Sequence, residues 1–139
     1  MNQKDIDGYY LEIARAVAVR STCLFCNVGC VIVDKDDNVI STAYLVDKIG
    51  ILNCRKNGIC SYEEHSGVKG GSGKPDTCDY MFPEVNAILT ADRERLKDAT
   101  MYIHVFDTVN KKITGTQLEK TLSKIILSSG IKRIVMPQS

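Results

Sequence analysis

The sequence predicts one α/β domain in which helices flank a mixed sheet. Three observations carry this prediction: an apolar helical stripe near the N-terminus, a β-rich hairpin directly after it, and alternating helical and strand patterns in the second half. With 139 residues, the chain 1–139 is long enough for one hydrophobic core and too short for two ordinary domains. Its 44% hydrophobic and 25% charged residues are typical of a globular protein.

The first half predicts a helix, a hairpin and a long connection. Residues 5–19 place apolar side chains at helical spacing behind an Asp cap. Residues 28–33 and 39–44 are β-rich, and the polar residues 34–38 between them form a turn, so a β-hairpin is expected. Residues 46–80 form a segment that is too long for an ordinary connection and is rich in Cys and Gly.

The second half alternates between helices and strands. We expect a helix at 84–96, a strand at 101–106, a turn at 110–112, a helix capped by Thr116 at 117–129, and a last strand at 131–136. Gly130 stops the second of these helices. The order of elements favours a layered α/β arrangement.

Charge and hydropathy exclude several classes of partner. The net charge of +1 gives no overall reason to expect nucleic-acid or membrane-surface binding. No apolar run approaches the roughly 18 residues of a membrane span, and the N-terminus lacks the pattern of a secretion signal. We therefore expect a cytoplasmic protein without membrane contact, in which six cysteines are thiols or metal ligands rather than disulfides.

Three cysteines and one histidine have structural interpretations. Cys23 and Cys26 are spaced as in a redox motif, but they follow a helix and precede a strand, which argues against redox activity. Cys30 lies in a predicted buried strand and is expected to behave as a small hydrophobe. His104 lies in another strand, where we expect a satisfied structural histidine rather than a ligand.

Three parts of the chain carry runs with a family likeness: residues 9–14 with 20–23 and 28–33 in the opening part, the run Phe-Pro-Glu-Val-Asn-Ala-Ile at 82–88, and Gly-Ile-Lys-Arg-Ile-Val at 130–135. Together these stretches resemble the deoxycytidylate (dCMP) deaminase branch of the cytidine deaminase-like superfamily. The resemblance covers nearly the whole chain in the right order. It implies a three-layer α/β/α fold with a mixed central sheet flanked by helices.

The same resemblance implies that the catalytic zinc site is lost. In the family, one His or Cys and two further Cys hold a zinc ion that activates water, and a Glu moves protons. The ligand positions fall on Phe82, Glu119 and Leu122, whereas Glu84 remains at the proton-shuttle position. No catalytic zinc is therefore expected. The helix dipole offers a structural alternative for Glu84, because it favours an acid in the first turn.

The nucleotide pocket implied by the resemblance is partly retained. Leu45 stands where the family has an Asn that lies in the pocket. Arg20, Ser21, Tyr44 and Asn86 remain at positions that could contact a nucleotide. An Arg at a helix C-terminus is explained equally well by the helix dipole.

Several family members hold a second, structural zinc that pins the long loop. The resemblance places Cys23, Cys54 and Cys78 at such ligand positions, with Cys60 or His65 as the fourth ligand. The alternative is that these cysteines are ordinary free thiols.

The sequence thus predicts a catalytically inactive relative that acts as a regulatory, scaffolding or nucleotide-sensing subunit. Its expected partners are copies of itself or an active paralogue, with a nucleotide as a further ligand. Two alternatives remain: a repurposed nucleotide reaction such as hydrolysis that uses Glu84, with Glu119 as a second carboxylate, or residual dCMP deaminase activity.

Overall fold

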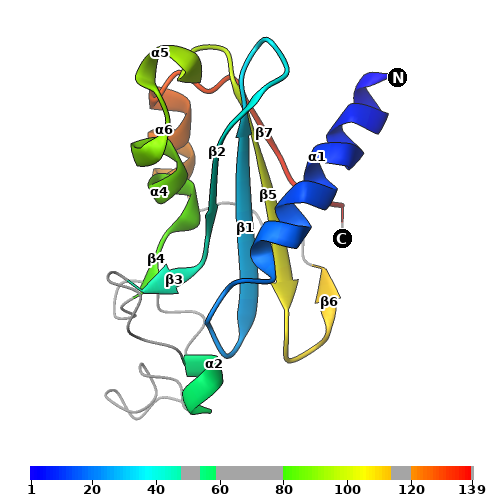
Figure 1. Ribbon diagram of the computed structural model, residues 1–139, viewed down its shortest axis with the longest axis vertical. Helices are drawn as coiled ribbons and strands as arrows, with labels where there is room; N and C mark the ends of the chain where they lie inside the picture. The colour runs from blue at the N-terminus through cyan, green and yellow to red at the C-terminus, as the bar shows by residue number, and fades with distance from the viewer. Residues whose placement is uncertain (48–53, 59–79, 114–119, 139) are drawn as a thin grey trace.

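The computed structural model describes residues 1–47, 54–58, 80–113 and 120–138, and these form a mixed sheet between two layers of helices (Figure 1). The sheet contains β1 (Cys26–Val33), β2 (Val39–Tyr44), β5 (Thr100–Asp107), β6 (Lys112–Ile113) and β7 (Arg133–Val135). Helix α1 (Gln3–Ala18) covers one face, whereas α4 (Pro83–Thr90), α5 (Arg93–Leu96) and α6 (Lys120–Ser128) lie on the other side. The predicted three-layer α/β/α fold is confirmed.

Three short elements lie outside this core; in Figure 1, β3 and β4 lie to the left of the lower half of β1, and α2 lies below them. Strand β3 (Val46–Asp47) pairs with β4 (Tyr80–Met81) in an antiparallel ribbon that leads into α4, and α2 (Cys54–Asn57) is a single helical turn. The remainder of the predicted long segment lies outside the described residues. None of the described helices is long and apolar enough to cross a membrane.

The central strands β1 and β5 pair antiparallel along their whole length, from Cys26 opposite Asp107 to Val33 opposite Thr100. Strand β2 returns antiparallel to β1, which confirms the predicted hairpin. The outer edge of β5 is shared: β7 pairs parallel to its first part, and β6 pairs antiparallel to its last part. The sheet is therefore mixed, as predicted.

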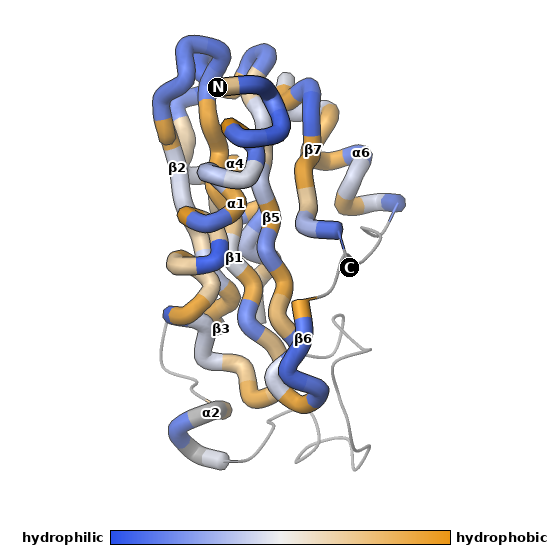
Figure 2. Tube along the Cα trace, turned by 90° about the vertical axis from the view of Figure 1, so that its right-hand side faces the viewer, coloured by the Kyte–Doolittle hydropathy of each residue, from blue (hydrophilic) through white to orange (hydrophobic). Residues whose placement is uncertain are grey.

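Alternating side chains of β1 and β5 build a separate core on each face, because successive residues of a strand point to opposite sides. Toward α4 and α6, the buried cluster includes Cys30, Ile32, Met101 and Ile103. Toward α1, the cluster consists of Tyr10, Ala14, Val31, Val33 and Tyr102. Figure 2 shows hydrophobic residues along the strands and hydrophilic ones in the turns at the top of the molecule.

Two predicted helix boundaries differ from the structure. Helix α1 begins earlier than expected and is capped by Asn2, whose Oδ1 accepts a hydrogen bond from the Asp5 backbone N–H at 2.9 Å. The prediction of one helix over 84–96 is wrong. Ala91 is extended (ψ 153°), and the Asp92 side chain caps a new helix by accepting from the Glu94 N–H.

The bounds of β5 and β7 differ from the predicted ones. The last strand spans only Arg133–Val135, and β5 is one residue longer at each end than expected. The described part of the last helix begins at Lys120, so the predicted Thr116 cap lies outside the described residues. Gly130 lies just after the end of α6 and has φ 109°, a left-handed conformation that favours glycine. It stops the helix, as predicted.

Candidate functional site

The candidate site centres on Glu84 in the first turn of α4. Pro83 occupies the start of this helix, where a missing N–H costs no helical hydrogen bond. Ser41 of β2 donates its hydroxyl to the Ala87 carbonyl at 2.7 Å, which ties the middle of the helix to the sheet. The helix therefore holds Glu84 in a fixed position, in the first turn after β4. Figure 1 shows β4 leading into α4 beside the β2–β3 connection.

The Glu84 side chain is buried and incompletely hydrogen-bonded. The residue is only 5% exposed, and Oε2 has no hydrogen-bond partner among the described residues. Burial raises the pKa of Glu84, and a hydrogen bond from its own backbone N–H offsets part of that effect. A buried carboxyl with a raised pKa and a free oxygen is a frequent feature of functional sites.

Cys30 of β1 lies in the same buried region and interacts electrostatically with Glu84. The thiol is fully buried, so its pKa is raised well above its usual value, and the negative charge of Glu84 adds to the increase. A thiol that stays protonated is a poor nucleophile. The prediction that Cys30 acts as a small hydrophobe is thus consistent with its place in the core.

The residues at the expected zinc positions do not fit a three-ligand catalytic zinc. Phe82 precedes α4, is 38% exposed and has no atom that binds a metal. Leu122 of α6 is buried in the same apolar cluster as Ala87. Glu119 lies outside the described residues. Even if Glu119 pointed into the site, one carboxylate would replace the three nitrogen or sulfur ligands such a centre needs.

Of the five residues predicted as ligands of the structural zinc, only Cys23 and Cys54 lie within the described residues. Cys54 is buried in α2 and Cys23 is half-buried before β1. The Cys23 sulfur accepts a hydrogen bond from the Phe25 backbone N–H at 3.4 Å. Cys60, His65 and Cys78 lie outside the described residues, so the predicted structural zinc stays a prediction. Within the described ranges, no three His, Cys, Asp or Glu residues are grouped to hold a metal.

Two of the predicted nucleotide-contacting residues contact each other. The Arg20 guanidinium lies over the Tyr44 ring, 4.8 Å from its centroid, in a cation–π contact. Backbone hydrogen bonds between Thr22 and Leu45 and between Leu45 and Val28 hold this corner together. The structure thus brings the end of α1 and the end of β2 into one cationic, aromatic corner.

Ser21 and Asn86 lie in more constrained positions. The buried Ser21 hydroxyl donates to the Val28 carbonyl at 3.1 Å and accepts from the Val28 N–H at 3.0 Å. A ligand contact at Ser21 stays a prediction that would require this pair to open. Asn86 lies on α4 two residues after Glu84, half-buried, with its N–H bonded to the Phe82 carbonyl.

His104 was not assigned to any site from the sequence, and the expectation that it is satisfied is wrong. It is 4% exposed, and neither ring nitrogen has a hydrogen-bond partner among the described residues. The missing hydrogen-bond partners could not be predicted from the position of His104 in its strand, because the surroundings of the ring depend on α1 and on strand pairing.

The fold and the buried glutamate at the start of α4 place the chain among the cytidine deaminase-like proteins. Residues 4–137 match the family model described as the cytidine and deoxycytidylate deaminase zinc-binding region, and the chain belongs to this family. It is 33% identical to the deoxycytidylate deaminase of Mycobacterium phage D29 over 138 residues, which cover 99% of this chain and 98% of the relative.

Other similarities extend the comparison. The deoxycytidylate deaminase of Schizosaccharomyces pombe is 35% identical over 114 residues, covering 81% of this chain and 34% of the relative. The crystal structure of apo dCMP deaminase from cyanophage S-TIM5 superimposes with a TM-score of 0.66 at 16% identity, covering 99% of this chain and 86% of the other. At this identity the structural match supports the fold alone.

Proposed function

We propose that the protein is a member of the dCMP deaminase family that does not deaminate dCMP and acts in the cytoplasm as a regulatory, scaffolding or nucleotide-sensing subunit. The observation that carries this proposal is the chemistry at the ligand positions. Phe82 and Leu122 have no lone pair for zinc, and Leu122 contributes to the apolar core instead. Water that is not bound to zinc has a pKa far above neutral, so Glu84 alone cannot make the attacking hydroxide.

The test is a deaminase assay on the purified full-length chain. We expect no dUMP from dCMP, with or without added zinc, and no difference between the wild-type protein and Glu84→Gln. The phage D29 relative, assayed in parallel, is the positive control for the reaction conditions. Formation of dUMP that is abolished both by a chelator and by Glu84→Gln would contradict the proposal.

Nucleotide sensing is supported by the corner formed by Arg20 and Tyr44. A guanidinium beside an aromatic ring can pair with a phosphate and stack a base. We expect dCMP or dUMP to raise the melting temperature of the wild-type protein, because a ligand that binds only the folded state stabilises it. Arg20→Gln should reduce this shift, whereas Arg93→Gln, an exposed arginine of α5, should not.

The proposed partners are copies of this chain or an active paralogue. Exposed apolar side chains on the outer helices, Leu89 of α4 and Ile125 and Leu127 of α6, support such an association. Light scattering of the purified chain, alone and with a deaminase paralogue, tests it. A monomer that forms no complex with the paralogue would argue against an assembly role.

A structural zinc at Cys23, Cys54 and Cys78, completed by Cys60 or His65, is part of the same proposal. Cys54 is 2% exposed within a single helical turn, a placement that a metal would stabilise. We expect one zinc per chain, lost in Cys54→Ser and retained in Cys30→Ala, which changes a core thiol outside the set. Equal zinc content in both variants would contradict this assignment.

A second candidate function is hydrolysis of a nucleotide at Glu84. It is supported by the raised pKa of Glu84 and its unpartnered Oε2, because a carboxyl with a raised pKa is suited to protonate the leaving base while water attacks C1′ of the N-glycosidic bond. Chromatography of dCMP and dUMP incubated with the protein would then show release of the free base, abolished by Glu84→Gln. Unchanged nucleotides would exclude this reaction for these substrates.

A further inference from the structure

A pocket of about 320 Å³ lies on the α1 side of the sheet, whereas α4 and Glu84 lie on the other side. Its walls come from the last part of α1 and from β1, β5 and β6, and include Arg15, His104, Phe106 and Ile113. In Figure 1 the end of α1 and strand β6 both lie beside the lower half of β5. The volume is at the lower end of the range for small-molecule sites, about 300–1,000 Å³.

His104 contributes a buried polar group to the wall of this pocket. The residue is 4% exposed, lines the pocket, and has no hydrogen-bond partner for either ring nitrogen among the described residues. Burying an imidazole without partners destabilises a fold, and most buried side-chain polar atoms in folded proteins are satisfied. A ligand in the pocket would supply the missing hydrogen bond.

The neighbours of His104 explain why the protein itself does not satisfy the ring. Its antiparallel partner on β1 is Gly29, which has no side chain to offer. Gly29 is required there because a Cβ would collide with the Ala14 carbonyl oxygen and the Ala18 backbone of α1. The close approach of α1 to β1 thus leaves the imidazole facing the pocket.

The positive charge at the pocket is that of Arg15. Burial lowers the pKa of His104, the Arg15 charge lowers it further, and Glu12 opposes these effects. The ring is therefore neutral at neutral pH and offers one donor and one acceptor. Arg15 forms an exposed ion pair with Glu12 at 2.9 Å, so a carboxylate bound in the pocket would be a second anionic partner of the same guanidinium.

We propose that this pocket binds a small heteroaromatic monocarboxylate, with the carboxylate at Arg15, the ring against the apolar side chains of Phe106 and Ile113, and a ring N–H donating to His104. The site is separate from the proposed nucleotide corner and does not depend on the proposed function. Indole-3-acetate has these groups at suitable ends of the molecule and serves as the probe. Indole-3-acetamide is the neutral control, because it lacks only the charge.

The experiment uses nuclear magnetic resonance of the histidine rings in the full-length protein. The chain has two histidines, so the His104 signal is assigned by its loss in His104→Phe. We expect indole-3-acetate to shift the His104 signal saturably, and the acetamide to bind about tenfold more weakly or worse. Excess dCMP should not displace the probe. Displacement by dCMP, or no shift of His104 with either probe, would overturn the proposal.

Two variants separate binding from folding. His104→Phe keeps a ring of similar size and removes both unsatisfied nitrogens, so the melting temperature should stay equal or rise while probe binding falls about tenfold or more. Arg15→Gln should weaken indole-3-acetate and leave the acetamide unaffected, and Arg93→Gln should change neither. A His104→Phe protein that is folded and still binds the probe at full affinity would also overturn the proposal.

Discussion

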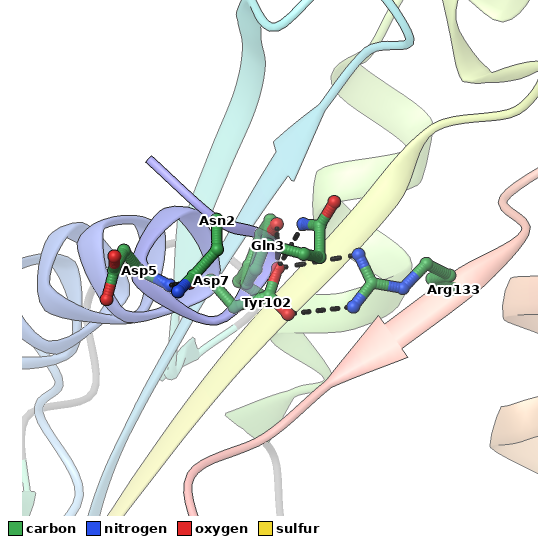
Figure 3. Close-up of polar contacts among 6 residues, drawn as sticks. All are labelled: Asn2, Gln3, Asp5, Asp7, Tyr102 and Arg133. Carbon is green, nitrogen blue, oxygen red and sulfur yellow. Dashed lines mark hydrogen bonds and ion pairs between the residues drawn. The ribbon is translucent and has the colours of Figure 1, made fainter.

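Asp7 of α1 and Arg133 of β7 form an ion pair of 2.8 Å between Oδ2 and Nη2 that joins the first helix to the last strand (Figure 3). Tyr102 of β5 donates its hydroxyl to Asp7 Oδ1 at 2.7 Å, and Gln3 donates to the same oxygen from within α1. One carboxylate thus connects α1 to two strands whose pairing is parallel. This network holds the α1 layer on the sheet at the end opposite β6.

We expect Asp7→Asn to destabilise the protein by about 1–2 kcal/mol, because it removes charge-assisted hydrogen bonds to partly buried partners. Glu12→Gln is the matched control, since Glu12 pairs with Arg15 on the exposed surface of the same helix and should cost less than about 0.5 kcal/mol. Urea unfolding of both variants measures the difference. Equal costs for the two variants would show that the network adds no stability.

The Asp7 effect should also depend on pH. Burial alone would raise the pKa of Asp7, but hydrogen bonds from Arg133, Tyr102 and Gln3 outweigh it, so the pKa lies below its ordinary value of 3.8. The stabilisation is therefore complete above 3.8 and is lost as the pH falls through the lowered value. The difference between wild-type and Asp7→Asn should shrink in acid.

The substitutions Gly29→Ala and Gly8→Ala should change the stability of the protein in opposite directions. A Cβ at Gly29 would lie 2.5 Å from the Ala18 nitrogen, whereas a Cβ at Gly8, within α1, meets nothing within 4 Å. Gly29→Ala should force α1 from the sheet and cost about 3 kcal/mol. Gly8→Ala should stabilise the helix by about 0.5–1 kcal/mol. Thermal unfolding distinguishes them, and a stable Gly29→Ala protein would contradict the observed helix–sheet contact.

The strands were predictable from the sequence because their apolar runs are continuous and end in polar turns. The turn after β1 is a clear case: Asp34 Oδ1 accepts from the N–H groups of Asp36 and Asn38, as such residues commonly do. The break at Ala91 was not predictable, because the apolar pattern continues through it to Leu96. There the Asp92 cap outweighs the periodicity.

For the candidate site, the resemblance located Glu84 and the expected ligand positions but not their environment. Burial of Glu84 and its free oxygen depend on how α4 packs on the sheet, which sequence spacing does not reveal. His104 was misjudged for the same reason, since its surroundings come from Gly29 on a neighbouring strand and from α1.

The last prediction concerns the energetic cost of keeping Glu84. Its folded-state pKa is raised above the ordinary 4.5 by burial, so between these two values the folded state binds more protons than the unfolded state. Stability then falls as the pH rises through this window, and the cost persists above it. Glu84→Gln should therefore gain about 1 kcal/mol over wild-type at neutral pH and nothing well below pH 4.5.

Glu94→Gln is the control, because Glu94 also lies in the first turn of a short helix but is exposed. Its stability should follow wild-type at every pH to within about 0.5 kcal/mol. Urea unfolding from acid to neutral pH measures both variants. A gain for Glu84→Gln that appears only above pH 4.5 indicates that the protein retains a destabilising carboxylate, as functional sites often do. A pH-independent difference would mean that the pKa of Glu84 is the same in the folded and unfolded states, and this would contradict the prediction.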